Sequence, residues 1–555
     1  MCWGFYRKGA KSMKDIFLYC KNYLTIYKGY ILLYIIIGLI SSASGLISPY
    51  IIGNFIDHLG YAEDMGFILN YFILFGIINI ISLILGYIGA RLYTIIQSRL
   101  GYELNKKFIK HMQHVPLNYL KSQDMAYLNQ QINGDANQLI MFCINTLHSI
   151  IINIIIMTVA LILLFSFNPL ISIILLVMTI LYTIIYLFYR KILYAVSYEY
   201  KEIQSNFFSK LYEQLINVRF IKIYSLFKDF ISKLDNSFTK LLKSALRYQH
   251  TSYIFSGLDK IVVLIAQLTL LFIGGREIIN NRLSIGHFVI ISSYFNMILG
   301  SIRYFFSLGQ SIQGTLVSKD RLEKLAVINI EPNGKETLEH INNIKVENLK
   351  FNYSEKNIIK DMNITFEKGH IYFIVGPNGI GKTTLIDILM GLHSNEYEGK
   401  IMYNDISIKD LDMYTIRQKL IGIFDQRPVL IKDTLRYNLN PIHQEMILEE
   451  HKEFNHLANL LEIDKYITDK LDTIINDNMS GGEMHKIALI RALINDNDLL
   501  ILDEPTSTLD AKSTLSLMNY LHTIKHKKII IVITHDNSYI DNTNDIIIDL
   551  KINSN

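Results

Sequence analysis

Residues 376–383 read Gly376-Pro377-Asn378-Gly379-Ile380-Gly381-Lys382-Thr383, and the residues around them indicate the fold of this part of the chain. The apolar run Ile371–Val375 comes before the octet and is typical of a buried strand, and Thr384–Met390 continues as a helix. The glycines let the backbone curl so that successive N–H groups point at phosphate oxygens. Lys382 then reaches the outer phosphates, and Thr383 can hold Mg2+ beside the helix N-terminus. The octet therefore predicts a nucleotide-binding P-loop between a strand and a helix.

The composition differs between the two halves of the 555-residue chain, which is long enough for two or three domains. Before about residue 310, Ile, Leu, Phe and Tyr dominate, whereas after about residue 340 charged residues are scattered through a soluble α/β pattern. The net charge of +4 does not indicate a nucleic-acid partner, and we expect none. The three cysteines are too few and odd in number, so they do not form a disulfide framework.

Long intervals without Lys or Arg predict membrane-spanning helices in the first half. No such residue occurs between Lys28 and Arg91 or between Lys121 and Arg190. A span needs about 20 mainly apolar residues. Buried core helices of a soluble protein are the alternative, but these are usually shorter and amphipathic. The six predicted spans are Gly29–Ile52, Gly66–Gly89, Thr146–Phe167, Leu170–Tyr189, Tyr253–Gly275 and Ser284–Ile302.

Basic segments beside the apolar runs predict the membrane topology. They are the N-terminal tail, Arg91–Lys121 and Arg190–Arg247, and the positive-inside rule places them in the cytoplasm. With six spans, both termini lie on that side. The long cytoplasmic segments have helical spacing of apolar residues, so we expect them to extend the membrane helices. Pro116–Leu120 and Leu215–Lys222 are the candidate contact elements within them, although they could be only solvated extensions.

These patterns predict a multi-domain membrane protein, with a six-helix all-α transmembrane domain followed by an α/β P-loop ATPase domain. The transmembrane domain is expected over residues 1–318 and the ATPase domain over residues 345–555. The linker over 319–344 contains Glu331-Pro332-Asn333-Gly334, which has turn chemistry and no long apolar run.

A second motif follows the P-loop at the end of another apolar strand. Leu499–Leu502 ends in Asp503-Glu504, and Mg2+ coordination beside a P-loop requires a carboxylate at the carboxyl end of a strand. A helix cap and a surface charge would be the alternative reading of such a pair. Because a P-loop is present, we favour the magnesium site.

The segment Met479-Ser480-Gly481-Gly482-Glu483, followed by Ile487–Ala492 and then by Asp503-Glu504, carries the resemblance to a known family. The second half resembles the nucleotide-binding domain of ATP-binding cassette transporters. The whole chain resembles an exporter-type half-transporter with fused transmembrane and ATPase parts.

This resemblance implies a role for each motif residue. Asp503 would hold the Mg2+ shell, and Glu504 would polarise the attacking water. Gln426, after the strand Ile421–Phe424, matches the loop glutamine that touches Mg2+, and His535, after the strand Ile529–Ile533, matches the histidine that contacts the γ-phosphate.

Three further residues are implied to act on ATP. Ser480 and the glycine amides after it would contact the γ-phosphate held by a partner subunit. Asp510 would lie in a loop that crosses the dimer interface. Tyr353 matches the aromatic that stacks on adenine, although it could instead be an ordinary core or surface aromatic.

The predicted catalytic residues are Lys382, Glu504 and His535, and the predicted Mg2+ ligands are Thr383, Gln426 and Asp503. The predicted ATP contacts are Tyr353, Gly376, Pro377, Asn378, Gly379, Ile380, Gly381, Lys382, Thr383, Thr384, Gln426, Ser480, Gly481, Gly482 and Asp510.

The expected activity is ATP hydrolysis coupled to export across a bacterial cytoplasmic membrane, by a dimer of this chain or with a paralogous half-transporter. Peptide cargo is favoured because Asn206–Leu211 and Asn217–Tyr224 resemble bacterial peptide and bacteriocin transporters. A lipid or multidrug exporter, an importer, and a non-transporting ATP-gated sensor or regulator remain alternatives. Two features depart from the family pattern: the first and fifth residues of the signature, and the short loop Thr473–Asn478.

Overall fold

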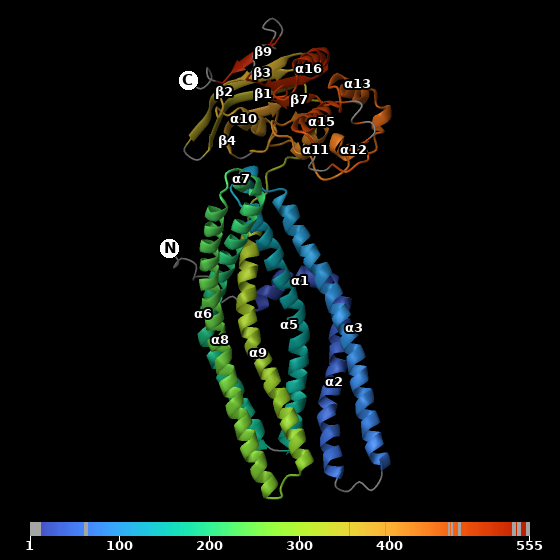
Figure 1. Cartoon of the computed structure of the whole chain (residues 1–555), viewed down its shortest axis with the longest axis vertical. Coiled ribbons are helices and arrows are strands. Elements are labelled where there is room, and N and C mark those ends of the chain that lie inside the picture. Colours follow the sequence, from blue (N-terminus) through green and yellow to red (C-terminus); the bar gives the residue numbers. More distant parts are fainter. Residues whose placement is uncertain are drawn as a thin grey trace. The chain divides into compact units, whose positions relative to one another are not determined.

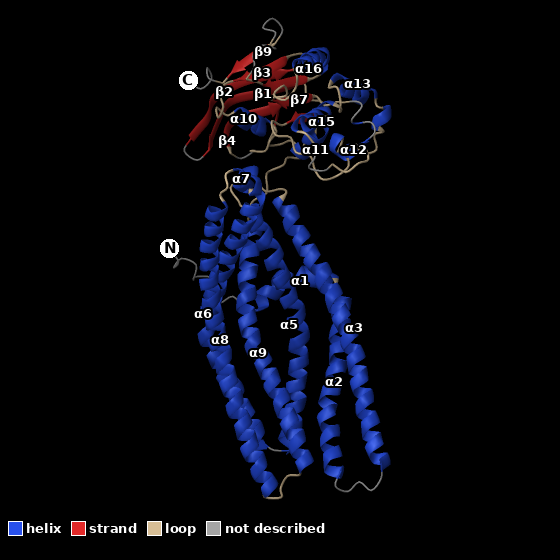
Figure 2. Cartoon of the chain, viewed as in Figure 1, coloured by secondary structure: helices blue, strands red, loops and turns tan. Residues whose placement is uncertain are grey.

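Residue contacts divide the computed structural model into two units (Figure 1). Unit 1 contains Met1–His114 and Tyr119–Ile328, and unit 2 contains Val115–Asn118 and Asn329–Asn555. In its described part, unit 1 is helical, whereas unit 2 combines strands and helices (Figure 2). The structure describes residues 13–59, 65–167, 169–353, 356–393, 396–463, 467, 470–475, 479–535, 540 and 545–550.

Six long helices contain the six predicted spans, one in each helix. The helices before the first strand are α1 (Met13–Ile26), α2 (Lys28–Leu59), α3 (Met65–Met112), α4 (Leu117–Lys121), α5 (Met125–Phe167), α6 (Pro169–Ile216), α7 (Val218–Ile223), α8 (Phe227–Ile279) and α9 (Ile285–Ala326). Both α3 and α6 have 48 residues. A helix of that length spans about 72 Å, whereas the hydrocarbon core of a bilayer is about 30 Å thick. These helices are therefore longer than the spans that they contain.

Five of the described helices are long and apolar enough to cross a membrane: α2, α3 from Ile68 onward, α5, α8 and α9. The remaining predicted span, Leu170–Tyr189, is helical as part of α6, but many of its side chains lie outside the described residues. The predicted class, a helical membrane domain followed by a nucleotide-binding domain, is confirmed.

The helical part continues past the predicted start of the linker. Helix α9 ends at Ala326, so residues 319–326 are helical, although the sequence predicts a linker from Lys319. Leu322 and Leu325 explain the difference, because both are buried in the core of unit 1 and continue the helical spacing of apolar residues. The turn sequence Glu331–Gly334 lies beyond the helix.

A buried group of charged residues, the α5–α6–α9 ion cluster, joins three helices of unit 1. It consists of Asp135, Lys201, Glu202 and Arg321. Arg321 donates from Nε to Asp135 Oδ2 at 2.7 Å and from Nη1 to Glu202 Oε1 at 2.7 Å. Lys201 Nζ donates to Asp135 Oδ1 at 3.2 Å and to Gln138 Oε1 at 2.6 Å. Two basic and two acidic side chains thus compensate one another. Asp135 and Arg321 are buried, whereas the Glu202 side chain is 31% exposed.

Unit 2 contains an antiparallel sheet and a parallel sheet. The antiparallel sheet has the order β2 (Lys356–Glu367), β1 (Asn343–Tyr353), β4 (Tyr397–Tyr403), β5 (Ile406–Ser407). The parallel sheet has the order β6 (Ile421–Phe424), β7 (Leu499–Asp503), β8 (Ile529–Ile533), β3 (Ile371–Val375), β9 (Ile546–Asp549). The predicted limits of β3, β6 and β8 are confirmed. The described helices are α10 (Lys382–Leu389), α11 (Met413–Lys419), α12 (Leu435–Leu439), α13 (Lys452–Leu460), α15 (Gly481–Leu493) and α16 (Ala511–Ile524), with short 3₁₀ turns η1 (Leu448–Glu450) and η3 (Lys525–Lys527).

The parallel sheet is buried on both faces, which is why its strands are continuous apolar runs. Alternate residues of β3 belong to different cores: Tyr372 and Ile374 to one, Ile371 and Phe373 to the other. Residues of β7 and β8 alternate in the same way. The first core also contains residues of α10 and of the antiparallel sheet, and the second contains residues of α13, α15 and α16.

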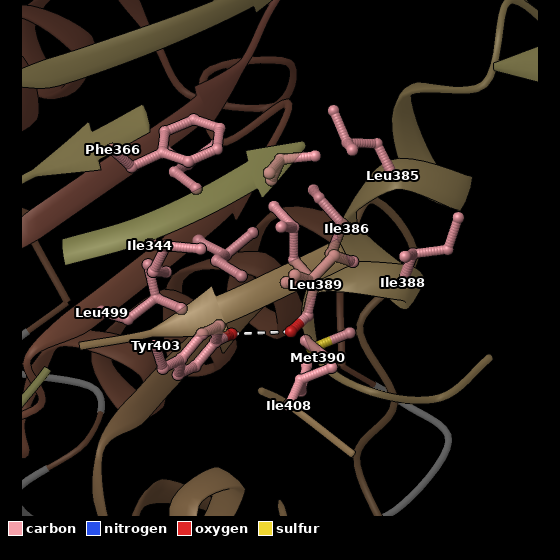
Figure 3. Packing of buried hydrophobic residues seen from close by; sticks show 14 of the residues in the cluster. Ile344, Phe366, Leu385, Ile386, Ile388, Leu389, Met390, Tyr403, Ile408 and Leu499 are labelled. Atoms are coloured by element: carbon pink, nitrogen blue, oxygen red, sulfur yellow. Dashed lines mark hydrogen bonds between the residues drawn. The ribbon is translucent and has the colours of Figure 1, made fainter. Parts of the chain in front are cut away.

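Helix α10 packs into the first core beside the antiparallel sheet (Figure 3). Leu385 and Leu389 of the helix lie in the same cluster as Ile344 and Phe366 of β1 and β2. The buried Tyr403 of β4 donates its hydroxyl to the carbonyl oxygen of Leu389 at 2.6 Å. These contacts hold α10 against the first core, and the hydrogen bond from Tyr403 lies at the carboxyl end of the helix, opposite the P-loop.

Candidate functional site

The predicted catalytic residues lie at one edge of the parallel sheet. Ile374 of β3 and Asp503 of β7 both pair with Ile533 of β8, so the carboxyl ends of the three strands are level. Phe424 of β6 pairs with Leu502 one strand further. The segments that follow these strands therefore meet at the same edge. Ligands of α/β sheets bind at this edge.

The P-loop turns between β3 and α10 through glycines with positive φ. Gly376, Gly379 and Gly381 have φ values of 153°, 78° and 110°. Gly381 precedes α10 directly, and a Cβ atom there would lie 2.4 Å from Cγ2 of Ile358 in β2. Both the backbone conformation and the space at this position require glycine.

The N-terminus of α10 offers free amide groups to a phosphate. Leu385 donates its N–H to the Gly381 carbonyl at 2.9 Å, so the amides of residues 382–384, including Thr384, have no acceptor within the helix. Together with the positive end of the helix dipole they form an anion site. Pro377 and Asn378 lie in the loop before the helix, and Ile380 packs against the first core.

The lysine of the P-loop is buried and contacts the backbone of the loop. Lys382 is 8% exposed, and its Nζ donates to the Gly376 carbonyl at 2.7 Å. Burial lowers the pKa of Lys382, while the charges of Glu504 and Asp503 act in the opposite direction. A phosphate beside Nζ would supply a further negative charge and favour the ammonium form.

Glu504, His535 and Gln426 contact one another beside Lys382. The Glu504 carboxylate accepts from Gln426 Nε2 at 2.9 Å, and its other oxygen lies 2.9 Å from His535 Nε2. The same imidazole nitrogen lies 2.8 Å from Lys382 Nζ. One nitrogen either donates to the carboxylate or accepts from the lysine, so the tautomer of His535 decides which contact is a hydrogen bond. The structure thus brings four predicted site residues from four segments into direct contact.

The backbone of Glu504 is strained. Its φ is 53°, in the left-handed region that a non-glycine residue rarely adopts, and its N–H donates to the Ile533 carbonyl at 2.9 Å. Such strain often lies at functional sites. The sequence gives no signal for it, because a glutamate does not indicate positive φ.

Thr383 and Asp503 present oxygen atoms that fit a magnesium ion. Thr383 Oγ1 lies 3.4 Å from Asp503 Oδ2, and Gln426 lies near them through the hydrogen bond from its Nε2 to Glu504 at 2.9 Å. Burial and the neighbouring Glu504 charge raise the pKa of Asp503 to about 6, so a cation here would be favourable. Among the described residues, no group of three or more His, Cys, Asp or Glu could hold a metal. Mg2+ usually takes one or two carboxylates together with substrate phosphates, so the oxygen set agrees with its preferences.

The signature motif caps a helix elsewhere in unit 2. Ser480 is the N-cap of α15: its hydroxyl accepts from the Glu483 N–H at 3.2 Å, and the Glu483 carboxylate accepts from the Ser480 N–H at 2.8 Å. Gly481 and Gly482 are the first two residues of this helix, so their amide groups lie at its N-terminus. Asp510 is likewise the N-cap of α16. Among the described residues, no hydrogen bond joins either cap to the P-loop.

Two parts of the prediction lie outside the described residues. Tyr353 ends β1, but its side chain is not described. Residues 476–478 of the short loop before the signature are not described either. Conversely, sequence reasoning missed Ile358, which packs against the P-loop at Gly381. Its place in a strand next to the P-loop in space, but not in sequence, hides it from motif searches.

A parallel sheet with a P-loop, a strand-end Asp-Glu pair and a helix-capping Ser-Gly-Gly segment defines unit 2 as a P-loop ATP-binding unit. The comparisons agree with this class. Residues 31–302 match the family model described as ABC transporter transmembrane region, and residues 359–507 match the model described as ABC transporter. The chain belongs to the ABC transporter family and carries the transmembrane and ATP-binding regions in one polypeptide.

Relatives with similar sequences include two transporters. ABC transporter B family member 1 of Dictyostelium discoideum is 22% identical over 526 residues, which cover 92% of this chain and 57% of the relative. The transport/processing ATP-binding protein ComA of Streptococcus pneumoniae is 24% identical over 486 residues, which cover 85% of this chain and 66% of the relative. This chain therefore spans less than two thirds of the length of either protein.

A solved structure has the same fold. It is that of a bacterial Atm1-family ABC exporter with ATP bound, with a TM-score of 0.84, 16% sequence identity and coverage of 94% of both chains. At this identity the likeness shows the fold alone.

Proposed function

We propose that the chain is one half of a dimeric exporter driven by ATP hydrolysis. The observation that carries the proposal is the contact of Lys382, Gln426, Glu504 and His535 at the end of the parallel sheet. An ammonium group, an amide, a carboxylate and an imidazole there surround the position that the γ-phosphate takes when the other phosphates lie on the P-loop amides. These are the groups that phosphoryl transfer to water requires.

Each of these groups has a distinct part in hydrolysis. Lys382 and the amides of residues 382–384 bind phosphate oxygens and neutralise charge. Glu504 orients the attacking water and accepts its proton as the new P–O bond forms and the bond to ADP breaks. His535 contacts the γ-phosphate and holds Glu504 in place. Mg2+, held by Thr383, Gln426 and Asp503, would neutralise the charge that develops on the phosphates.

The position of the signature helix supports the proposed dimer. Ser480 and the amides of Gly481 and Gly482 offer an anion site at the N-terminus of α15, yet the described residues show no hydrogen bond from it to the P-loop of the same chain. In the proposed dimer this site faces the γ-phosphate on the partner's P-loop. The partner is a second copy of this chain or a paralogous half-transporter.

Peptides are the proposed cargo. The names of two relatives support them: ComA is a transport/processing protein, and the lactococcin-A transport/processing ATP-binding protein LcnC of Lactococcus lactis is 22% identical over 499 residues. Lipids are the alternative, since the ATP-dependent lipid A-core flippase of Syntrophus aciditrophicus is 26% identical over 321 residues. We place the protein in a bacterial cytoplasmic membrane, with the ATPase unit in the cytoplasm, where the basic segments are predicted to lie.

ATP hydrolysis by the purified protein in lipid nanodiscs tests the catalytic proposal. The change Glu504→Gln removes the general base while keeping the size of the side chain, so kcat should fall by about a hundredfold or more and ATP binding should persist. The matched control is Glu339→Gln, which changes an exposed glutamate outside the site. Undiminished turnover in Glu504→Gln would contradict the role of Glu504.

Transport into inverted vesicles tests the cargo. Wild-type protein should accumulate a labelled peptide in the lumen in the presence of ATP, and the Glu504→Gln protein should not. Movement of a labelled lipid between leaflets without peptide uptake would favour the lipid alternative. ATP binding and hydrolysis without either transport would favour a sensor or regulator.

A further inference from the structure

Helix α1 has a basic outer face and a buried inner face. Ile16 and Cys20 are fully buried in the core of unit 1, where α1 lies across the long helices and contacts α2, α3, α5 and α9 (Figure 1). Lys14, Lys21 and Lys28 are exposed. Lys14 and Lys21 lie seven residues apart on the same face of α1, and Lys28 is the first residue of α2.

A groove of about 470 Å³ runs along this face. Its volume lies within the range of about 300–1,000 Å³ that is usual for small-ligand sites. The three lysines line it together with apolar residues of three helices, and none of the described residues that line it is acidic. The other lining residues are Phe17, Leu18, Leu24, Thr25, Ile31, Leu32, Ile35 and Leu147.

The lysines have no protein counter-ion in the described part of the chain. None of Lys14, Lys21 and Lys28 forms a hydrogen bond or an ion pair there. Their charges are therefore available to a ligand. Leu18 and Leu32, at the edge of the groove, are 66% and 60% exposed. Large exposed apolar side chains beside unpaired ammonium groups suit a ligand with an anionic head and an apolar tail.

By the proposed topology, the groove lies at the cytoplasmic surface of the membrane, where lipid headgroups meet acyl chains. Ile31 and Ile35 belong to the beginning of the first predicted span, and Leu147 to the beginning of the third. By the proposed topology, both spans begin at the cytoplasmic surface. The apolar lining thus faces the ends of the acyl chains nearest the headgroups, and the lysines face the headgroups.

We propose that this groove is a binding site for one anionic phospholipid of the cytoplasmic leaflet. The anionic headgroup lies beside these lysines, and an acyl chain covers the apolar residues of α1, α2 and α5. The lipid thereby joins α1 to the first and third spans and compensates the like charges of Lys14 and Lys21 on α1 and of Lys28 at the start of α2. The inference depends on the proposed topology but not on ATP hydrolysis or on the nature of the cargo.

A tryptophan in the groove can report lipid binding directly. Trp3 is the only tryptophan of the chain, so Trp3→Phe with Leu18→Trp places a single reporter at the edge of the groove. The full-length protein is placed in nanodiscs of phosphatidylcholine that contain increasing fractions of phosphatidylglycerol with brominated acyl chains. Bromine quenches tryptophan on contact. A parallel series uses brominated phosphatidylcholine, which has the same tails and no net charge.

We expect brominated phosphatidylglycerol to quench at a much lower mole fraction than brominated phosphatidylcholine. Each lysine near an anionic lipid surface contributes about a fivefold gain in binding. Replacing Lys14, Lys21 and Lys28 by Gln should therefore weaken binding about a hundredfold, so that the variant needs as much brominated phosphatidylglycerol as brominated phosphatidylcholine for half-quenching. Replacing the same three by Arg should preserve it. The matched control replaces Lys228, Lys240 and Lys243 by Gln, which removes three exposed charges from α8, and should have little effect.

Three results would overturn the proposal: equal quenching by the two lipids, unchanged quenching after the Gln replacement of the three groove lysines, or an equal loss in the α8 control. Displacement of the brominated lipid by glycerophosphoglycerol, the headgroup without acyl chains, would instead identify a soluble phosphate ligand and would also overturn it. ATPase activity is not part of the readout. The site can therefore be tested even where the proposed transport function fails.

Discussion

Two independent features require glycine at position 381. The φ of Gly381 is 110°, and a Cβ atom added there would lie 2.4 Å from Cγ2 of Ile358. We predict that Gly381→Ala weakens binding of a fluorescent ATP analogue by at least about tenfold, because the left-handed conformation alone costs about 1–2 kcal/mol. Adding Ile358→Ala relieves the clash but not the backbone strain, so affinity should recover only in part. Gly369→Ala is the control: its φ is 96°, nothing lies within 4 Å, and it lies outside the P-loop. Equal loss of affinity in that control would contradict a local effect.

The contacts of His393 with two carboxylates should stabilise unit 2 at low pH, and this stabilisation should be lost at high pH. Its Nδ1 lies 2.6 Å from Glu396 Oε2 and its Nε2 3.8 Å from Asp387 Oδ2. Burial lowers the pKa of His393, but the hydrogen bonds and charges of the two carboxylates together outweigh burial and raise it. The stabilisation is therefore fully present below the unfolded-state pKa of about 6.5 and is lost as pH rises through the higher folded-state pKa.

The variant His393→Gln tests this pH dependence. The difference in thermal unfolding midpoint between wild type and variant should be largest near pH 5.5 and should shrink by about pH 8.5. The exposed His250 of α8 provides the control, and His250→Gln should follow the wild type throughout. A difference that grows with pH would reverse the sign and contradict the assignment.

At the scale of elements, the α5–α6–α9 ion cluster holds three helices of unit 1 together. Asp135→Asn leaves the buried Lys201 and Arg321 with Glu202 as their only acidic partner in the cluster. Such an uncompensated buried charge costs about 3–5 kcal/mol, so the thermal midpoint of the purified protein should fall by several degrees. Adding Lys201→Met restores neutrality and should recover most of the loss. Asp229→Asn, in an exposed pair on α8, should change little.

At the scale of the whole molecule, the proposed dimer predicts a test with mixed subunits. One subunit carries Lys382→Ala and the other Ser480→Arg, and each homodimer should be inactive. If the signature acts on the partner's P-loop, the mixed dimer combines both defects in one site and keeps the other intact. It should then retain about half of the wild-type activity, provided that the two sites work independently.

The matched arrangement places both changes in one subunit and pairs it with wild type. Each composite site then carries one defect, so activity should be lost. The reverse pattern, with activity in this arrangement and none in the mixed dimer, would mean that Ser480 acts within its own chain. Co-purification through two different affinity tags isolates each combination for the ATPase measurement.

Local sequence predicts much of unit 2 because burial on both faces leaves a strong signal. Ile371–Val375, Ile421–Phe424 and Ile529–Ile533 are apolar throughout, and the structure has strands with these limits. The end of α9 was harder, because Lys319 and Asp320 read as polar linker residues. Both are buried by neighbouring helices, which the sequence cannot indicate. The roles of the predicted site residues stay predictions.

Local sequence is sufficient to indicate the class of the chain, because periodicity and the spacing of short motifs depend only on neighbouring residues. They indicate the helical membrane part, the P-loop and the strand-end Asp503-Glu504. Which of these groups touch depends on the folded chain. Residues as distant in sequence as Lys382 and His535 meet because parallel strands align their carboxyl ends. Tertiary packing likewise brings Ile358 of the antiparallel sheet against Gly381, and the fold holds Glu504 at a positive φ. Contacts across a sheet depend on strand order and register, which no single segment encodes.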